Sequence, residues 1–75
     1  MRAEEANEAI WEALATHFRR SPEALTPEQV VEMTAFDEEV VKNGLATLLN
    51  NGQIEGVPVA ELAHPIRITG VNYQY

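Results

Sequence analysis

Hydrophobic and polar positions follow a helical spacing over the first fifty residues and a two-residue alternation after that. The first helical pattern runs from Ala3 to Phe18, with apolar residues every three or four positions and glutamates on the opposite side. Arg19 and Arg20 come next, where the negative end of the helix dipole favours cations. Ser21-Pro22 is predicted to end this helix, because the residue before a proline is disfavoured in helical backbone.

A second helix is predicted after a short connector at residues 22–25. Thr26 can cap it, Pro27 suits the first helical position because no N–H is needed there, and Gln29 completes a capping box. Its buried face is expected to consist of Val30, Val31 and Met33. Residues 34–37 supply the turn into a third helix, and two helices joined by such a turn form a helix-turn-helix candidate.

The third helix is predicted at residues 37–51, and both of its ends are marked. The Asp37 carboxylate can accept hydrogen bonds from the free N–H groups of the first turn, and Phe36 can pack over Val41. Gly52 is free to take the left-handed conformation of a C-terminal cap. The inner side of the helix consists of Val41, Gly44, Leu45, Leu48 and Leu49, and the glycine lets another helix approach closely.

The alternation after the third helix is typical of β-strands. A first strand contains Ile54 and Val57 and is ended by Pro58, and a second strand contains Ile66 and Ile68. The connection over residues 58–65 is longer than a tight two-residue turn. Together the strands predict an antiparallel hairpin.

The apolar positions of the second strand change phase at Gly70. Before this glycine they carry even numbers, and after it they carry odd ones, at Val71, Tyr73 and Tyr75. A one-residue change of phase at a glycine predicts a β-bulge, after which the same face still points inward. The alternative is that the last five residues fray, as chain ends often do.

The composition fits one small globular domain. The chain has 75 residues, of which 45% are hydrophobic, and we expect a single domain over residues 1–75. It has no cysteine, which excludes disulfides and thiolate metal sites and fits a reducing compartment. No unbroken apolar run marks a signal peptide or a membrane span, so we expect a cytoplasmic protein. The predicted core consists of Ile10, Leu14, Phe18, Val30, Val31, Phe36, Val41, Leu45, Leu48, Ile54, Ile66 and Ile68.

The order of helix, short capped helix, helix ending in glycine, strand, loop and strand resembles the winged helix-turn-helix superfamily. The positions that carry the resemblance are Val41, Leu45, Leu48, Gly52 and Ile54. The resemblance covers nearly the whole chain and implies an α+β fold, a three-helix bundle with a C-terminal antiparallel β-hairpin wing. It also implies that the helix at 37–51 enters the DNA major groove, and that the wing at 58–65 reaches the phosphate backbone or the minor groove.

The charge of the chain opposes that second implication. Twelve acidic residues against five basic ones give a net charge of −7, which repels polyanions such as DNA and anionic membranes. Duplex DNA binding depends on clustered cations, and the expected wing has Glu61 but no Lys or Arg. The residues that could contact DNA are Arg19, Arg20, Lys42, Asn43, Asn50 and Arg67. The alternative interpretation is therefore a DNA-binding transcription regulator. Its dimer would pool the four cations on one surface, namely Arg19, Arg20, Lys42 and Arg67.

The preferred interpretation is an acidic protein-interaction or adaptor module, acting alone or as a homodimer. Apolar and aromatic residues near the C-terminal end exceed what so small a core can bury, and aromatic side chains are enriched at interfaces. The predicted interaction residues are Glu38, Glu39, Val59, Leu62, Tyr73 and Tyr75. Trp11 has two interpretations, since it can complete the core or contact a partner.

Enzymatic and metal chemistry are not expected from this sequence. The only imidazoles, His17 and His64, have no ligand at a metal-binding spacing, and we predict exposed or capping positions for both. The adjacent pairs Glu4-Glu5 and Glu38-Glu39 diverge around a helix and cannot share a reaction centre. We expect no cofactor, no small-molecule substrate and no catalytic residue.

Overall fold

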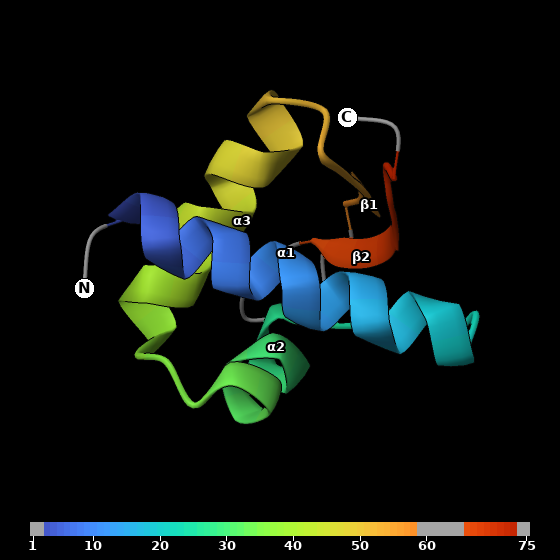
Figure 1. The fold of residues 1–75 in the computed structure, drawn as a ribbon, viewed down its shortest axis with the longest axis horizontal. Helices are drawn as coiled ribbons and strands as arrows, with labels where there is room; N and C mark the ends of the chain where they lie inside the picture. The colour runs from blue at the N-terminus through green and yellow to red at the C-terminus, as the bar shows by residue number, and fades with distance from the viewer. Residues whose placement is uncertain (1–2, 59–65, 74–75) are drawn as a thin grey trace.

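Three helices precede a two-stranded antiparallel hairpin in the computed structural model, which describes residues 3–58 and 66–73. The elements are α1 (Ala3–Arg20), α2 (Pro27–Thr34), α3 (Glu38–Asn50), β1 (Ile54–Val57) and β2 (Arg67–Val71). Helix α1 lies across the other elements and contacts α2, α3 and β2 (Figure 1). The predicted α+β class is confirmed, and the arrangement is consistent with a winged helix. No helix within the described residues is long and apolar enough to cross a membrane.

The start of α2 confirms the predicted capping box. The Gln29 N–H donates to the Thr26 hydroxyl at 3.2 Å, and the Thr26 N–H donates to the Gln29 side-chain oxygen at 2.9 Å. The helix ends at Ala35, which has a positive φ of 58° and whose N–H donates to the carbonyl oxygen of Val31. The left-handed conformation of this residue turns the chain toward α3.

One residue predicted on the buried face of α2 is exposed instead. Met33 has 42% of its surface exposed, whereas Val30 and Pro27 are buried and Val31 is half-buried. In a helix of 3.6 residues per turn, positions 27, 30, 31 and 34 share a face, and position 33 lies about 100° away from its centre. The prediction for Met33 was wrong because so short a helix buries only the one face that these four positions share.

The predicted cap is present at the C-terminal end of α3 but not at its N-terminal end. Gly52 has a φ of +73°, as predicted, and its N–H donates to the carbonyl oxygen of Leu49. Asp37 is the N-cap residue, but its side chain makes no capping hydrogen bond. The predicted carboxylate cap was therefore wrong. Asp37 is exposed, so water competes for its carboxylate and for the free N–H groups of the first turn.

The hairpin contains the predicted β-bulge. Ile54 pairs with Val71 and Glu55 with Gly70, but the next residue, Gly56, pairs with Ile68, so Thr69 is the extra residue on β2. The bulge thus lies next to Gly70. Ile68 before the bulge is buried, and Val71 after it packs against the core.

The connector before α2 is more ordered than the sequence suggested. Leu25 pairs with Ile68 in an antiparallel bridge, with hydrogen bonds of 2.8 and 2.7 Å between the two backbones. Leu25 is also a core residue with 4% exposure. The predicted connector is present, but its bridge to Ile68 was not predicted, because a single apolar residue gives no periodic signal.

The predicted core is otherwise confirmed. Eight of its members are buried, namely Ile10, Leu14, Val30, Val41, Leu45, Leu48, Ile54 and Ile68. The remaining four are half-buried and pack against that cluster, namely Phe18, Val31, Phe36 and Ile66. Gly44 explains the close approach of α1 to α3, since a Cβ there would lie 2.6 Å from Ile10 Cδ1 and 2.9 Å from Asn7 Oδ1.

Candidate functional site

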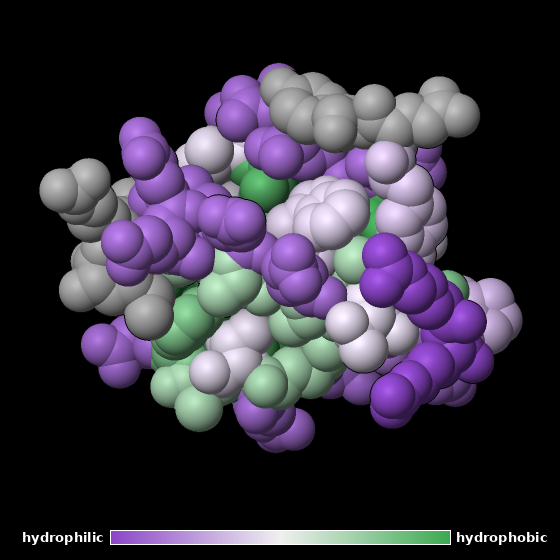
Figure 2. Space-filling model, viewed as in Figure 1, coloured by the Kyte–Doolittle hydropathy of each residue, from purple (hydrophilic) through white to green (hydrophobic). Residues whose placement is uncertain are grey.

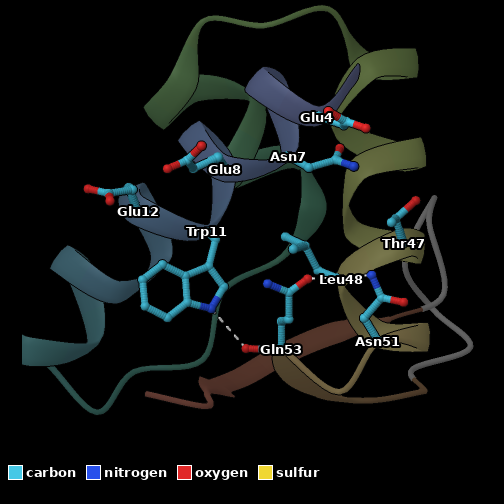
Figure 3. A pocket seen from close by; sticks show the side chains of 9 residues that line it. All are labelled: Glu4, Asn7, Glu8, Trp11, Glu12, Thr47, Leu48, Asn51 and Gln53. Atoms are coloured by element: carbon cyan, nitrogen blue, oxygen red, sulfur yellow. Dashed lines mark hydrogen bonds between the residues drawn. The ribbon is translucent and has the colours of Figure 1, made fainter. Parts of the chain in front are cut away.

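A cleft of about 610 Å³ lies between one side of α1 and the C-terminal half of α3. We call it the α1–α3 cleft. Three glutamates of α1 line it, Glu4, Glu8 and Glu12, together with Asn7 and Trp11 of the same helix. The other side consists of Thr47, Leu48, Asn51 and Gln53. Figure 3 shows Asn7 pointing from α1 toward α3, with Thr47 and Asn51 on the α3 side.

The three glutamates form a row along α1. They follow one another every four residues, so consecutive members stand about 6 Å apart along the helix axis. All three are exposed. No lysine, arginine or histidine is among the residues that line the cleft. The electrostatic potential in the cleft is therefore negative, which favours a cation and opposes a phosphate.

Trp11 is fixed at one end of the cleft. Its indole Nε1 donates to the carbonyl oxygen of Gln53 at 3.0 Å, as Figure 3 shows. The Tyr73 ring meets the indole edge to face, with centroids 6.2 Å apart. Tyr73 itself donates from its hydroxyl to the carbonyl oxygen of Ala15, and the Arg19 guanidinium lies 5.6 Å from its ring centroid. Trp11 is half-buried and packs against the core cluster, as one of its two predicted roles requires.

The opposite side of the cleft is polar and rests on the core. Leu48 is buried and forms its floor. The Asn51 amide donates to the side-chain oxygen of Gln53 at 3.5 Å, and the Thr47 hydroxyl donates to the carbonyl oxygen of Asn43. With Asn7, the cleft thus offers three primary amides, each with donors and acceptors for a polar ligand.

The residues predicted to contact DNA do not share one surface. Lys42, Asn43 and Asn50 are exposed on α3, and Arg67 is exposed at the start of β2. The end of α1 that carries Arg19 and Arg20 lies on the other side of the molecule from α3 (Figure 1). Exposed Glu38 and Glu39 occupy the first turn of α3. One chain therefore brings no more than one lysine to the exposed side of α3.

The predicted interaction residues are only partly covered by the described residues. Val59, Leu62 and Tyr75 lie outside the described ranges. Tyr73 is 50% exposed and holds the contacts with Trp11 and Arg19 given above. Among the other large apolar side chains, Met33, Val40 and Val57 are exposed. Figure 2 shows a second, apolar area below α1, distinct from the polar area around the cleft.

Histidine and carboxylate groups form no metal site in residues 3–58 and 66–73. His17 Nε2 lies 2.8 Å from the carbonyl oxygen of Glu23, and its ring meets Phe18 edge to face. That contact ties the end of α1 to the connector, and because Glu23 lies beyond the helix it is not a cap of α1. His17 is half-buried, so the predicted exposed or capping position was wrong. His64 lies outside the described residues.

The α1–α3 cleft itself was not predicted from the sequence. The glutamates were placed on a face that points to solvent, and Asn7, Asn51 and Gln53 had no predicted role. A signal was present, because Glu4, Asn7, Glu8 and Trp11 fall on one side of a helix. The facing residues of α3 become visible only when the angle between the two helices is known.

Comparison with known proteins identifies no family for this chain. No protein-family model matches the chain. Searches of curated proteins and of solved structures give no match either. Only the chemistry of the surface therefore bears on function.

Proposed function

We propose that this chain is a non-enzymatic protein-interaction module whose partner docks over the α1–α3 cleft. The observation that carries the proposal is the composition of the cleft, which combines carboxylates, amides and an indole with no cation. Aromatic rings surrounded by polar groups are typical of protein interfaces. The proposal differs from the sequence-based expectation in its location, since it uses α1 and the end of α3.

An enzymatic function has less support from the same groups. The glutamates of the cleft are all exposed and stand in one row, so nothing sets one apart as an acid and another as a base. The cleft contains no cysteine, histidine or lysine, and its one hydroxyl, that of Thr47, donates to a backbone carbonyl. The side chains that line the cleft are therefore better suited to binding a partner than to catalysis.

DNA binding is the competing function, and the position of the cations weakens it. Groove-binding proteins hold their register through several phosphate contacts. Here the exposed side of α3 has Lys42 beside Glu38 and Glu39, and the arginines of α1 lie across the molecule. A dimer would have to bring these distant groups onto one surface.

Site-specific photo-crosslinking in the source cells tests the proposal. A photoreactive amino acid replaces Thr47 in the cleft and, in a matched control, Glu32, which is exposed on α2. We expect a discrete crosslinked protein from position 47 and not from position 32, and the purified pair should form the same crosslink. A product of twice the chain mass would identify a second copy as the partner. No protein crosslinked at position 47 contradicts the proposal.

A titration with mixed-sequence duplex DNA tests the competing function. Amide shifts are followed residue by residue at about 20 mM and about 200 mM salt, because phosphate contacts weaken steeply with salt. We expect no saturable shifts at either concentration. Saturable shifts at Lys42, Asn43 and Arg67 that fade with salt would show a DNA-binding regulator instead.

A further inference from the structure

We propose that the α1–α3 cleft binds an extended basic segment of the partner protein, with one lysine or arginine stacked on Trp11 and others paired with the glutamate row. This inference rests on the proposed function and names the chemistry of the partner. The proposed segment has a basic residue at every second position.

The exposed part of Trp11 is suited to a cation or an apolar group. Its only polar atom, Nε1, already donates to Gln53, so the ring surface toward the cleft offers no hydrogen bond. An aromatic face attracts ammonium and guanidinium groups, and tryptophan does so most strongly. The chain already contains one such pair, Arg19 over Tyr73, directly beside the indole. Glu8 and Glu12 line the same cleft and add negative charge to it.

The spacing of the glutamates matches that of a β-strand. Four residues of α1 advance about 6 Å. Two residues of an extended chain advance about 6.6 Å, and their side chains point to the same side. A Lys-x-Lys-x-Lys segment lying along α1 therefore places one ammonium near each of Glu4, Glu8 and Glu12. Paired charges of this kind would speed the encounter and fix the register of the segment.

The amides of the cleft favour an extended segment over a helical one. Backbone N–H and C=O groups of a helix are bonded to each other, whereas those of an extended segment need partners. Asn7 on α1 and Asn51 on α3 face the same cleft and offer both donors and acceptors. The small side chains between the lysines point to the opposite side, toward Thr47 and Asn51 of α3.

A peptide titration tests this inference, and the chain supplies its own probe. Trp11 is the only tryptophan, so its fluorescence reports on the cleft alone. The ligand is acetyl-Ala-Lys-Ala-Lys-Ala-Lys-Ala-amide, and the control peptide has glutamate in place of each lysine. We expect a saturable change in emission with the lysine peptide only, and an affinity that falls as salt rises from about 20 to about 200 mM.

Charge-removing variants locate the binding site. Glu8→Gln and Glu12→Gln should each weaken binding by roughly 3- to 10-fold, since each removes one charge-assisted contact. The matched control is Glu32→Gln, which removes the same charge from α2 and should leave the affinity unchanged. Equal affinities for Glu8→Gln and Glu32→Gln would overturn the inference, because attraction would then come from net charge alone. Thermal melts of all three variants confirm that each is folded.

The remaining outcomes separate this inference from the function on which it rests. If spermidine at the same charge concentration changes Trp11 emission as strongly as the peptide, the cleft is a small-cation site and the peptide inference is wrong. If the peptide fails to bind while the crosslink from position 47 persists, the module has a partner of another chemistry. If both fail, the proposed function is wrong as well.

Discussion

Helices α1 and α3 meet along two strips of different character. In the closed strip, Ile10 packs against the backbone of Gly44, and Leu14 and Leu45 are buried in the same cluster. In the open strip, glutamates and Trp11 of α1 face Thr47 and Asn51 of α3 across the α1–α3 cleft. The same two helices thus form a dry interface and a polar cleft side by side.

The difference between the strips comes from the side chains and not from the backbone. A missing Cβ at Gly44 brings the helices together where apolar groups face each other. Carboxylates and amides cannot be buried without partners, so the strip that carries them stays open to water. Asn7 lies at the border, since its amide is next to Gly44 and also lines the cleft.

The largest expected effect comes from a charge in the closed strip. Leu45 is 2% exposed, and Leu45→Asp should prevent folding. An unpaired buried carboxylate costs several kcal/mol, which is comparable with the whole stability of about 4–11 kcal/mol for a chain of this size. Ala46→Asp, on the exposed side of the same turn, is the control and should melt close to the parent. Circular dichroism melts decide, and equal melting of the two variants would contradict the assigned helix face.

A smaller loss is expected from filling the glycine gap. Gly44→Val adds a branched side chain where a Cβ alone would already lie 2.6 Å from Ile10 Cδ1. Overpacking of this kind costs about 1–3 kcal/mol. Ala46→Val adds a branched side chain on the exposed side and should cost only about 0.5 kcal/mol through helix propensity. Urea denaturation measures both, and a Gly44→Val variant as stable as Ala46→Val would mean that the helices can move apart freely.

Trp11 lines the open strip and also packs against the core, and removing its hydrogen bond should have an intermediate effect. Trp11→Phe deletes the donor to Gln53 while keeping an aromatic ring. We expect a loss of about 1 kcal/mol, the typical net value of one such bond, measured by circular dichroism in urea. The Gln53 carbonyl still accepts from the Asn72 N–H at 2.9 Å, which limits the loss. An unchanged stability would show that water replaces the indole.

The smallest effect, with the opposite sign, is expected in the open strip. Glu8 has a like charge four residues away on each side, at Glu4 and Glu12, and such pairs destabilise a helix by about 0.2–0.5 kcal/mol. Glu8→Gln should therefore raise stability slightly at low salt, and the gain should fade as salt increases. Glu23→Gln, which removes an exposed carboxylate with no acidic residue four positions away, serves as the control and should show no such gain. A stability loss in Glu8→Gln would show that this carboxylate supports the fold.

Most of the fold could be predicted from the sequence because its signals are local. The capping box at Thr26, the left-handed Gly52 and the phase change at Gly70 each depend on a few adjacent residues, and all three are confirmed. Asp37 shows the limit of the same reasoning. Its position at the helix start was predicted correctly, but the hydrogen bond depends on competition with water that residue type does not reveal.

The candidate site could not be predicted because it depends on how two helices are placed. In the sequence, Trp11 lies 40 residues and Glu8 lies 43 residues before Asn51, and no spacing rule connects them. The rotation of α1 about its axis decides whether its glutamates point to open solvent or border a cleft. Leu25 was missed for a related reason, since its partner Ile68 comes from the far end of the chain.

The bridge between Leu25 and Ile68 has a consequence for how the molecule opens. Its two hydrogen bonds join the connector before α2 to the second strand of the hairpin, and both residues lie in the core. The amide hydrogens of these residues can exchange with solvent only when the core itself comes apart. We therefore expect the hairpin and the helices to unfold as one cooperative unit.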